Sequence, residues 1–337
     1  MKILVITDLY PIKKDEKYTP HTIETFVKNW QKLGHEVKVI KPNFLLNSFL
    51  RQKPYYPNGA YGNIENINFI TPFWGNINTS FTPDIVIAHM PSGILYADKL
   101  GLPFCAAVHA SDIEVLTKPI YRFHFKPRLE KAYKNAMKIA CRSEVLKQKF
   151  LKLYPEFKEK TFVAPSGING AIKRVWSNNN KIKVLTCGQF IKRKHIDDVI
   201  LACKNFENLE LTVIGSGKEK MPDGAFFTGQ LPHKDVLEKM RESDIFILPS
   251  EKETFGMVYL EAMASGCITV CRKGDGIDGI IKDGENGFVC TDVNEVLKKI
   301  LIYPDKNKIL ESSFNTVSNL TEEKTAENYL SNIINQN

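Results

Sequence analysis

The sequence predicts an α/β protein made of two doubly wound, Rossmann-like domains that face a central cleft. Three observations support this. The chain of 337 residues is too long for one ordinary core. Apolar strand patterns alternate with helical patterns in two separate series. A polar stretch, Trp176–Lys181, separates the two series and is the best linker candidate.

The first series opens with a strand–helix–strand unit. Lys2–Thr7 is a short apolar run, and Thr22–Leu33 has apolar residues at helical spacing and is stopped by Gly34. Glu36–Ile40 gives the next strand, so the unit implies a parallel sheet. The later elements of this series are strands at Asn68–Ile70, Asp84–Ala88 and Phe104–Val108 and helices at Tyr121–Met137 and Glu144–Leu153.

The second series has the same alternation. Its expected strands are Lys183–Cys187, Leu209–Ile214, Ile245–Leu248, Ile268–Cys271 and a run near Gly287–Cys290. Its expected helices are Ile196–Phe206, His233–Glu242 and Val258–Ser265. These patterns predict one domain over residues 1–175, a second over residues 181–320 and a terminal helix over residues 321–337.

Composition narrows the class of protein. Apolar residues make up 43% and charged residues 25% of the chain, as in ordinary globular proteins. The opening apolar run is too short for a signal peptide, and no stretch approaches the roughly 18 apolar residues of a spanning helix. We therefore expect a cytoplasmic protein, or one attached to the inner face of the membrane. The seven scattered cysteines complete no zinc spacing and are expected to be buried thiols.

Nicotinamide and flavin chemistry is disfavoured. The first strand is followed by Asp8–Pro11 instead of the glycine-rich turn of dinucleotide-binding proteins. Gly215-Ser216-Gly217 follows a later strand, but it is only a fragment of that motif.

The most informative string runs from Ile245 to Phe288. An apolar strand ends at Pro249-Ser250, and a polar loop with Glu253 then leads through Gly256 into a helix that carries Glu261. The free N–H groups at the start of a helix bind phosphate oxygens, and glycine lets the backbone approach an anion closely. Carboxylates on either side can accept hydrogen bonds from hydroxyl groups. A nucleoside diphosphate sugar has this layout of ribose diol, diphosphate and hexose hydroxyls.

This string resembles the glutamate-x7-glutamate signature of the retaining group 1 glycosyltransferases, which have the two-domain GT-B fold. That family includes glycogen synthases and bacterial enzymes that build lipopolysaccharide, capsule and mannosyl lipids. The resemblance implies that Glu253 holds hydroxyls of the transferred sugar and Glu261 the ribose diol. It also implies that the loop contacts the diphosphate and the sugar through Phe255, Gly256, Met257 and Val258.

The resemblance extends to other segments. In Gly188–Lys194, which looks like the family's glycine-arginine…lysine segment, Lys194 would bind phosphate. Gln189 stands where many members have arginine, so Arg193 or Lys192 would have to supply that charge. Three further segments match, namely Phe227–Leu231 near the base, Pro165–Asn169 before the link, and Lys324–Leu330 in a helix that crosses back to the first domain.

Two first-domain features bear on the site. Val108–Asp112 resembles the loop whose histidine, here His109, approaches the transferred sugar. His109 and the similarly placed His89 have structural histidines as their alternative, and for Asp112 a helix cap is the favoured interpretation. Family members usually have paired glycines after the first strand, whereas this chain has Thr19–Thr22, which puts a first-domain contribution to donor binding in doubt.

The basic residues are concentrated in one segment. Thr117–Lys152 holds eleven Lys and Arg but only two acidic residues, which accounts for the whole net charge of +8. Its aromatic residues cluster at one end, so nucleic-acid binding is disfavoured. A solvated helical face is the simplest interpretation, and binding of a lipid-linked acceptor or an anionic membrane is the functional one. The candidates for this role are Lys126, Arg128, Lys131 and Lys134. Phe44–Arg51 is either an amphipathic interfacial element or a loop packed on the core.

Together these features predict an enzyme that moves a hexose from a UDP or GDP sugar to a bacterial-type glycan or lipid-linked acceptor. The resemblance implies retention of anomeric configuration. No Asp-x-Asp site is visible in the sequence, so we expect protein cations to replace a metal ion, and we expect no cofactor. The catalytic residues would be His109, Glu253 and Lys194, with the acceptor on the first domain and the donor on the second. If the enzyme inverts instead, His109 or Asp112 would be the base. An epimerase or phosphorylase of the same fold, or a non-catalytic nucleotide-sugar-binding protein, is the alternative.

Overall fold

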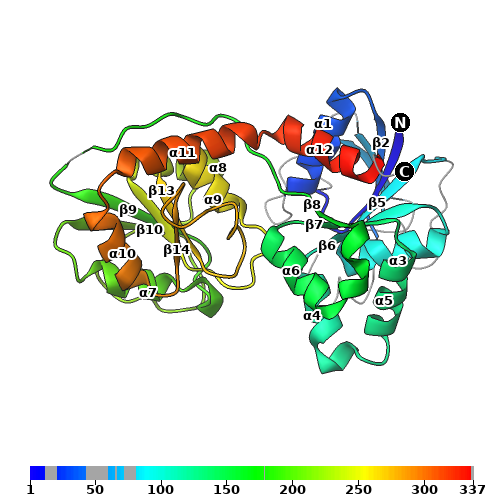
Figure 1. Cartoon of the computed structure of the whole chain (residues 1–337), viewed down its shortest axis with the longest axis horizontal. Coiled ribbons are helices and arrows are strands. Elements are labelled where there is room, and N and C mark those ends of the chain that lie inside the picture. Colours follow the sequence, from blue (N-terminus) through cyan, green and yellow to red (C-terminus); the bar gives the residue numbers. More distant parts are fainter. Residues whose placement is uncertain (12–20, 43–59, 65–66, 72–80, 178, 335–337) are drawn as a thin grey trace. The chain divides into compact units, whose positions relative to one another are not determined.

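The computed structural model describes the chain except for residues 12–20, 43–59, 65–66, 72–80, 178 and 335–337 (Figure 1). It contains two compact units. Met1–Arg142, Leu146–Pro165 and Thr325–Asn337 form the N-terminal unit, whereas Ser143–Val145 and Ser166–Lys324 form the C-terminal unit. Of the predicted features, Thr19–Pro20 and Phe44–Arg51 lie outside the described residues.

An eight-stranded sheet forms the centre of the N-terminal unit, in the order β3-β4-β2-β1-β5-β6-β7-β8. All neighbouring pairs are parallel except β3 and β4. The strands are β1 (Lys2–Ile6), β2 (Glu36–Ile40), β3 (Ala60–Ile64), β4 (Ile67–Thr71), β5 (Ile85–His89), β6 (Phe104–Val108), β7 (Lys138–Cys141) and β8 (Thr161–Val163).

Helices accompany this sheet in the alternation that a parallel sheet requires. They are α1 (Thr22–Lys32), α3 (Met90–Leu100), α4 (Ala110–Thr117), α5 (Phe125–Asn135), α6 (Glu144–Leu153) and the C-terminal α12 (Glu322–Ile334). The last helix is part of the N-terminal core, because the Trp30 indole N–H donates to the Ala326 carbonyl at 2.8 Å and Tyr329 packs edge-on against Phe26 and Trp30.

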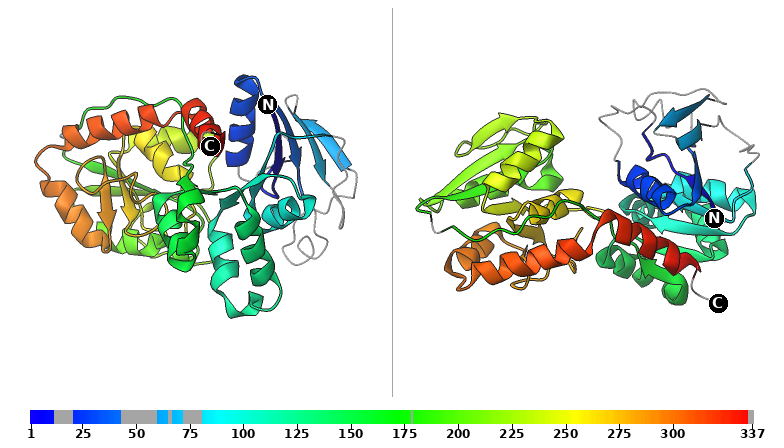
Figure 2. Two further views of the ribbon diagram at one scale, coloured as in Figure 1. Left: turned by 45° about the vertical axis from the view of Figure 1, so that its right-hand side comes forward. Right: turned by 90° about the horizontal axis from the view of Figure 1, so that it is seen from above.

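The C-terminal unit has a six-stranded, wholly parallel sheet in the order β11-β10-β9-β12-β13-β14. Its strands are β9 (Ile182–Cys187), β10 (Leu209–Ile214), β11 (Phe226–Gly229), β12 (Ile245–Leu248), β13 (Ile268–Arg272) and β14 (Phe288–Cys290). Its helices are α7 (Ile196–Cys203), α8 (His233–Glu242), α9 (Met257–Ala264), α10 (Val293–Ile302) and α11 (Lys306–Asn319). Figure 2 shows both units from two further sides.

The structure confirms the prediction of two doubly wound α/β units and refines its details. The helix expected over Tyr121–Met137 is wrong at its start. A 3₁₀ turn occupies Pro119–Tyr121, and α5 begins only at Phe125. All seven cysteines are free thiols, and six of them are buried. None of the helices in the described part of the chain is long and apolar enough to cross a membrane.

Candidate functional site

The loops of the C-terminal unit converge at one edge of its sheet. Because β9, β10, β12 and β13 are parallel, their carboxyl ends all lie at this edge, where α/β proteins bind their ligands. The loops after β9 and β10 pack tightly. Gly215 has φ +140°, and a Cβ atom there would lie 1.9 Å from the Gly188 carbonyl oxygen. The Gly215-Ser216-Gly217 fragment therefore serves loop packing, and the Phe190 N–H donates to the Ser216 carbonyl at 2.9 Å.

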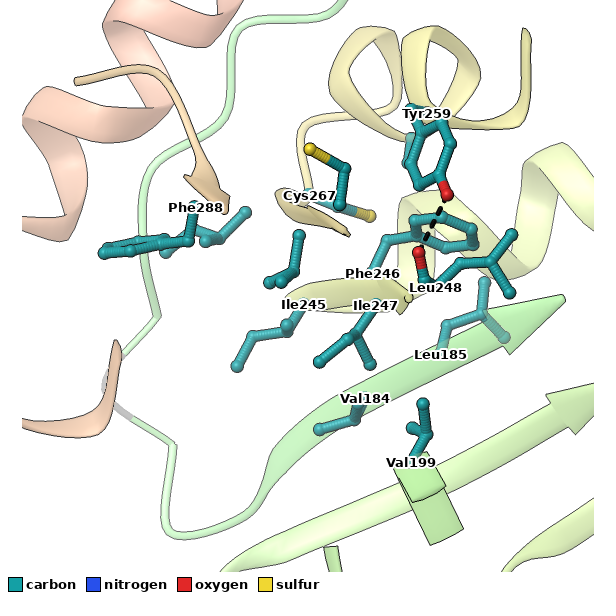
Figure 3. Packing of buried hydrophobic residues seen from close by; sticks show 14 of the residues in the cluster. Val184, Leu185, Val199, Ile245, Phe246, Ile247, Leu248, Tyr259, Cys267 and Phe288 are labelled. Carbon is teal, nitrogen blue, oxygen red and sulfur yellow. Dashed lines mark hydrogen bonds between the residues drawn. The ribbon is translucent and has the colours of Figure 1, made fainter. Parts of the chain in front are cut away.

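The turn after β12 is held by the core beneath it. All four side chains of β12 are buried, and Figure 3 shows them among the side chains of β9 and α7. The Tyr259 hydroxyl donates to the Leu248 carbonyl at 2.8 Å and so ties the first turn of α9 to the end of the strand (Figure 3). Gly256 precedes the helix at φ +88°, a left-handed conformation that favours glycine. The first N–H groups of α9, at Met257 and Val258, have no carbonyl partner within the helix.

Glu253 is the centre of a charged cluster in this turn. Its Oε1 atom accepts hydrogen bonds from Lys194 Nζ at 2.5 Å, Ser250 Oγ at 2.7 Å and Arg193 Nη1 at 3.0 Å. No hydrogen bond to Oε2 is formed by any residue that the structure describes. The cluster thus places two cations beside one carboxylate, which leaves an excess positive charge next to the start of α9.

The environment of Glu253 keeps it ionised. Burial acts to raise the pKa of this carboxyl, but Lys194, Ser250 and Arg193 together outweigh burial and hold the pKa below its ordinary value. The carboxylate is therefore a permanent hydrogen-bond acceptor near neutral pH.

Neighbouring loops fix the position of this turn. Asp275, after β13, accepts the N–H of Lys252, which has an unusual positive φ of 59°. A Cβ atom at Gly276 would lie 3.1 Å from Glu253 Cβ, so the two loops are in contact. The Glu251 side chain has different partners from Glu253. It forms ion pairs with Arg272 at 2.8 Å and with His195 at 3.2 Å.

The second predicted carboxylate, Glu261, lies on α9. Its Oε1 atom is 3.0 Å from His233 Nε2, at the start of α8. The hydrogen bond to Glu261 raises the pKa of His233, although burial opposes it. Both Glu261 and Lys194 act on Cys187, the last residue of β9. Burial raises the pKa of this thiol to about 11, Glu261 adds to the rise and Lys194 opposes it.

The structure brings together Arg193, Lys194 and Glu253 from segments about sixty residues apart. Phe255 is buried beneath the turn, Met257 and Val258 are partly buried, and Gln189 is exposed. Sequence reasoning missed Ser250, His233 and Asp275 as members of the site. The sequence does contain a signal for Ser250, because this residue comes just after the strand and three residues before Glu253.

His109 belongs to the N-terminal unit, where it follows β6. Its Nε2 atom is 3.1 Å from Nδ1 of His89, the last residue of β5, and both side chains are almost fully buried. Asp112, in the first turn of α4, accepts the His109 N–H at 2.9 Å through Oδ2 and the Tyr133 hydroxyl at 2.8 Å through Oδ1. Asp112 therefore acts as the helix cap that the sequence favours.

This histidine pair is expected to remain neutral well below pH 6. Burial, reinforced by the Arg142 charge, lowers the pKa of His109 to about 3, and burial also lowers the pKa of His89. In NMR spectra recorded as a function of pH, the imidazole signals of both residues should not shift between pH 7 and about pH 5. A titration of either ring near pH 6.5 would contradict this description.

The lowered pKa of His109 makes its contribution to the stability of the fold depend on pH. A folded-state pKa below the unfolded one means that the contribution of His109 is present above about pH 6.5 and is lost as the pH falls towards 3. Asp112 has the opposite sign, because burial raises its pKa to about 7, so its contribution is present below about pH 4 and is lost as the pH rises through 7.

The four basic candidates, Lys126, Arg128, Lys131 and Lys134, all lie on α5 of the N-terminal unit. Lys126 is 3.8 Å from Glu130, and the other three are exposed. Within the described part of the chain, no group of three or more His, Cys, Asp or Glu side chains is placed to hold a metal ion.

Two models of known protein families match the chain. The model described as glycosyl transferases group 1 matches residues 170–311, and the model described as glycosyltransferase family 4 matches residues 21–171. The two adjoining matches cover most of the chain. The chain belongs to the group 1 glycosyltransferases.

Individual relatives agree with this assignment. The chain is 29% identical to an uncharacterized glycosyltransferase of Methanocaldococcus jannaschii, over 62% of this chain and 60% of that protein. It is 26% identical to a glycosyltransferase provisionally assigned to teichuronic acid biosynthesis in Bacillus subtilis, over 83% of each chain. The fold matches that of the Anabaena protein HepE, solved in complex with UDP, with a TM-score of 0.70 and 14% identity over 98% of this chain and 99% of that one.

The candidate site residues lie within the matched regions. Lys194, Glu253 and Glu261 fall in the part that matches the group 1 model, and His109 falls in the part that matches the family 4 model. The GT-B fold predicted from the sequence is thus confirmed. The roles of the individual residues stay predictions.

Proposed function

We propose that this glycosyltransferase takes a hexose from a nucleoside diphosphate sugar held by its C-terminal unit. The observation that carries the proposal is the pairing of Lys194 and Arg193 with Glu253 beside the free amides of α9. A diphosphate would neutralise the excess positive charge of this cluster and accept hydrogen bonds from the Met257 and Val258 N–H groups. The UDP complex of the Anabaena structure supports a donor of this class.

The two carboxylates would then hold the ends of the donor. The Oε2 atom of Glu253 would accept a hydrogen bond from a hexose hydroxyl, while its Oε1 atom keeps the contacts to Lys194, Arg193 and Ser250. Glu261 would accept hydrogen bonds from the ribose diol, in place of or beside the contact with His233.

In the reaction, the anomeric C–O bond to the diphosphate breaks, and negative charge grows on the departing diphosphate. Lys194, Arg193 and the α9 amides would stabilise that charge, as a divalent ion does in other transferases. We therefore propose transfer without a metal ion.

The N-terminal unit supports retention of configuration. An inverting enzyme needs a base. His109, with a pKa of about 3, is a weak one. Asp112 has a suitable pKa of about 7, but its side chain is fully buried and both of its oxygens already accept hydrogen bonds. In the retaining path the diphosphate oxygen takes the proton of the acceptor hydroxyl on the same face of the sugar. We propose that the acceptor is a glycan or a lipid-linked sugar, at or near the cytoplasmic membrane, and the Bacillus relative named for teichuronic acid biosynthesis supports a polymer of the cell envelope.

A donor panel tests this function. UDP and GDP sugars are incubated with the protein, and release of the nucleoside diphosphate is measured with and without candidate acceptors. A transferase releases diphosphate slowly alone and faster with an acceptor, and the anomeric proton signal of the product reports retention. An epimerase would convert the donor without this release, a phosphorylase would require phosphate, and a binding protein would release none.

Glu261→Ala should weaken binding of the nucleoside diphosphate by about 10- to 100-fold, the loss expected for one charged hydrogen bond. Calorimetry with UDP and GDP measures this change. Glu238→Ala, on the exposed face of α8, is the control and should leave affinity unchanged. Equal affinities of wild type and Glu261→Ala would remove Glu261 from the donor site.

A further inference from the structure

An unusual apolar surface lies at the turn between α4 and α5. Ile120 and Phe123 are 82% and 89% exposed, and Phe125 is 46% exposed. Single exposed apolar residues are common, but three within six residues are not scattered at random. The turn projects away from the sheet of the N-terminal unit in Figure 1 and in the left view of Figure 2. We call residues Lys118–Lys126 the α4–α5 tip.

Positive charge surrounds this tip. Between Thr117 and Asn135 there are six basic residues and one acidic residue, Glu130. The guanidinium of Arg122 lies over the Phe123 ring at 5.6 Å from its centroid. On α5, three basic side chains are exposed: Arg128, Lys131 and Lys134. Only Lys118 and Lys126 of the six have a carboxylate near them, Glu114 and Glu130 respectively, among the residues that the structure describes.

We propose that the α4–α5 tip attaches this enzyme to an anionic lipid bilayer, with Ile120 and Phe123 in the headgroup region and the basic side chains on lipid phosphates. Aromatic and aliphatic side chains gain free energy at the membrane interface, and Lys and Arg are attracted to anionic lipids. Either signal alone gives weak attachment, and the tip combines them. The proposal rests on the proposed function only in that a lipid-linked acceptor would be found at such a surface.

A bilayer fits this tip better than a nucleic acid does. Single-stranded nucleic acids bind by stacking bases on aromatic rings along a basic groove. Ile120 is one of the most exposed residues of the tip and has no ring on which a base could stack. The exposed side chains also lie on a projecting turn and not along a groove.

Vesicle flotation with the full chain tests the proposal. One set of vesicles contains phosphatidylcholine alone, and the other contains equal parts of phosphatidylcholine and phosphatidylglycerol. The protein should float with the anionic vesicles in about 50 mM NaCl, less in about 500 mM NaCl, and little with the neutral vesicles. Absence of binding to anionic vesicles at low salt, or tighter binding of a mixed-sequence oligonucleotide than of vesicles, would overturn the proposal.

The structure offers a matched pair of variants. Ile120→Ser should lower the partition coefficient on anionic vesicles by about tenfold, and adding Phe123→Ser should lower it further. Ile302→Ser makes the same change at a residue of the C-terminal unit that is 83% exposed, and should leave partitioning unchanged. Equal partitioning of Ile120→Ser with Phe123→Ser and of wild type would contradict insertion of the tip.

This test is independent of catalysis. Vesicle binding needs no donor, and both serine variants should release diphosphate from a water-soluble donor at the wild-type rate. If flotation fails while donor turnover is observed, only the membrane surface is wrong. If flotation succeeds while no donor is bound, the proposed function is wrong and the surface stands.

Discussion

Glu253→Gln is expected to lower the rate of sugar transfer by about 100-fold or more while leaving a folded protein. The substitution keeps the size of the side chain but removes the negative charge that holds Lys194 and Arg193. It also weakens the acceptor offered to the hexose hydroxyl, whose hydrogen bond should strengthen as the anomeric bond breaks. Turnover of the preferred donor and acceptor measures the effect, and thermal unfolding confirms the fold.

Glu251→Gln is the matched control for this change. Glu251 lies in the same turn and is also ion-paired, but its partners are Arg272 and His195. We expect its kcat to remain within a few-fold of wild type. If Glu253→Gln and Glu251→Gln lose activity equally, the charge of the turn matters only for its structure and Glu253 has no special role.

Lys194→Met should lower kcat by about 100- to 1,000-fold, because it removes a cation from the place where charge grows on the leaving diphosphate. The methionine side chain fills similar volume, so the loop should keep its conformation. The variant should also bind nucleoside diphosphate more weakly, since the ground-state diphosphate carries charge too.

Lys192→Met provides the comparison. Lys192 belongs to the same run of three basic residues, but it is exposed, whereas Lys194 and Arg193 both contact Glu253. Rates measured at saturating donor should be near wild type for Lys192→Met. A comparable loss in both variants would mean that the run acts through its net charge instead of through one placed ammonium group.

The run of three basic residues also shows which features of the site the sequence alone can predict. The run Lys192-Arg193-Lys194 predicts a phosphate site, but three adjacent cations do not say which side chains point inward. The local backbone conformation determines which side chains point inward. A 3₁₀ turn over Lys192–Lys194 is followed by His195 in the left-handed conformation at φ 52°, and this turn directs Arg193 and Lys194 to Glu253. Of the two cations that could replace the charge missing at Gln189, Arg193 is the one that contacts Glu253.

Most strands of the two sheets were predicted, whereas several helices were not, among them α10 and α11. β12 is a continuous apolar run, Ile245–Leu248, so its position follows from the sequence. α3 was missed because its first turn contains Pro91 and Gly93, which weaken a helical pattern. Gly93 is there for packing, since a Cβ atom would lie 2.4 Å from the Ile6 carbonyl oxygen. Such a requirement is visible only in the folded chain.

Two contacts near the glutamates could not be predicted from the sequence either. His233 reaches Glu261 across 28 positions of sequence, and Asp275 reaches Lys252 across 23. Neither contact leaves a local pattern, because each depends on which strands are neighbours in the sheet. The glutamates themselves could be found, because the strand, turn and helix that carry them are consecutive in the chain.

A structure of this enzyme with UDP or GDP bound would show whether the start of α9 binds the diphosphate. Phosphate oxygens should lie within hydrogen-bond distance of the Met257 and Val258 N–H groups and of Lys194 Nζ, and the ribose hydroxyls should contact Glu261. A nucleotide bound elsewhere, with no contact to the turn between Pro249 and Met257, would contradict this prediction.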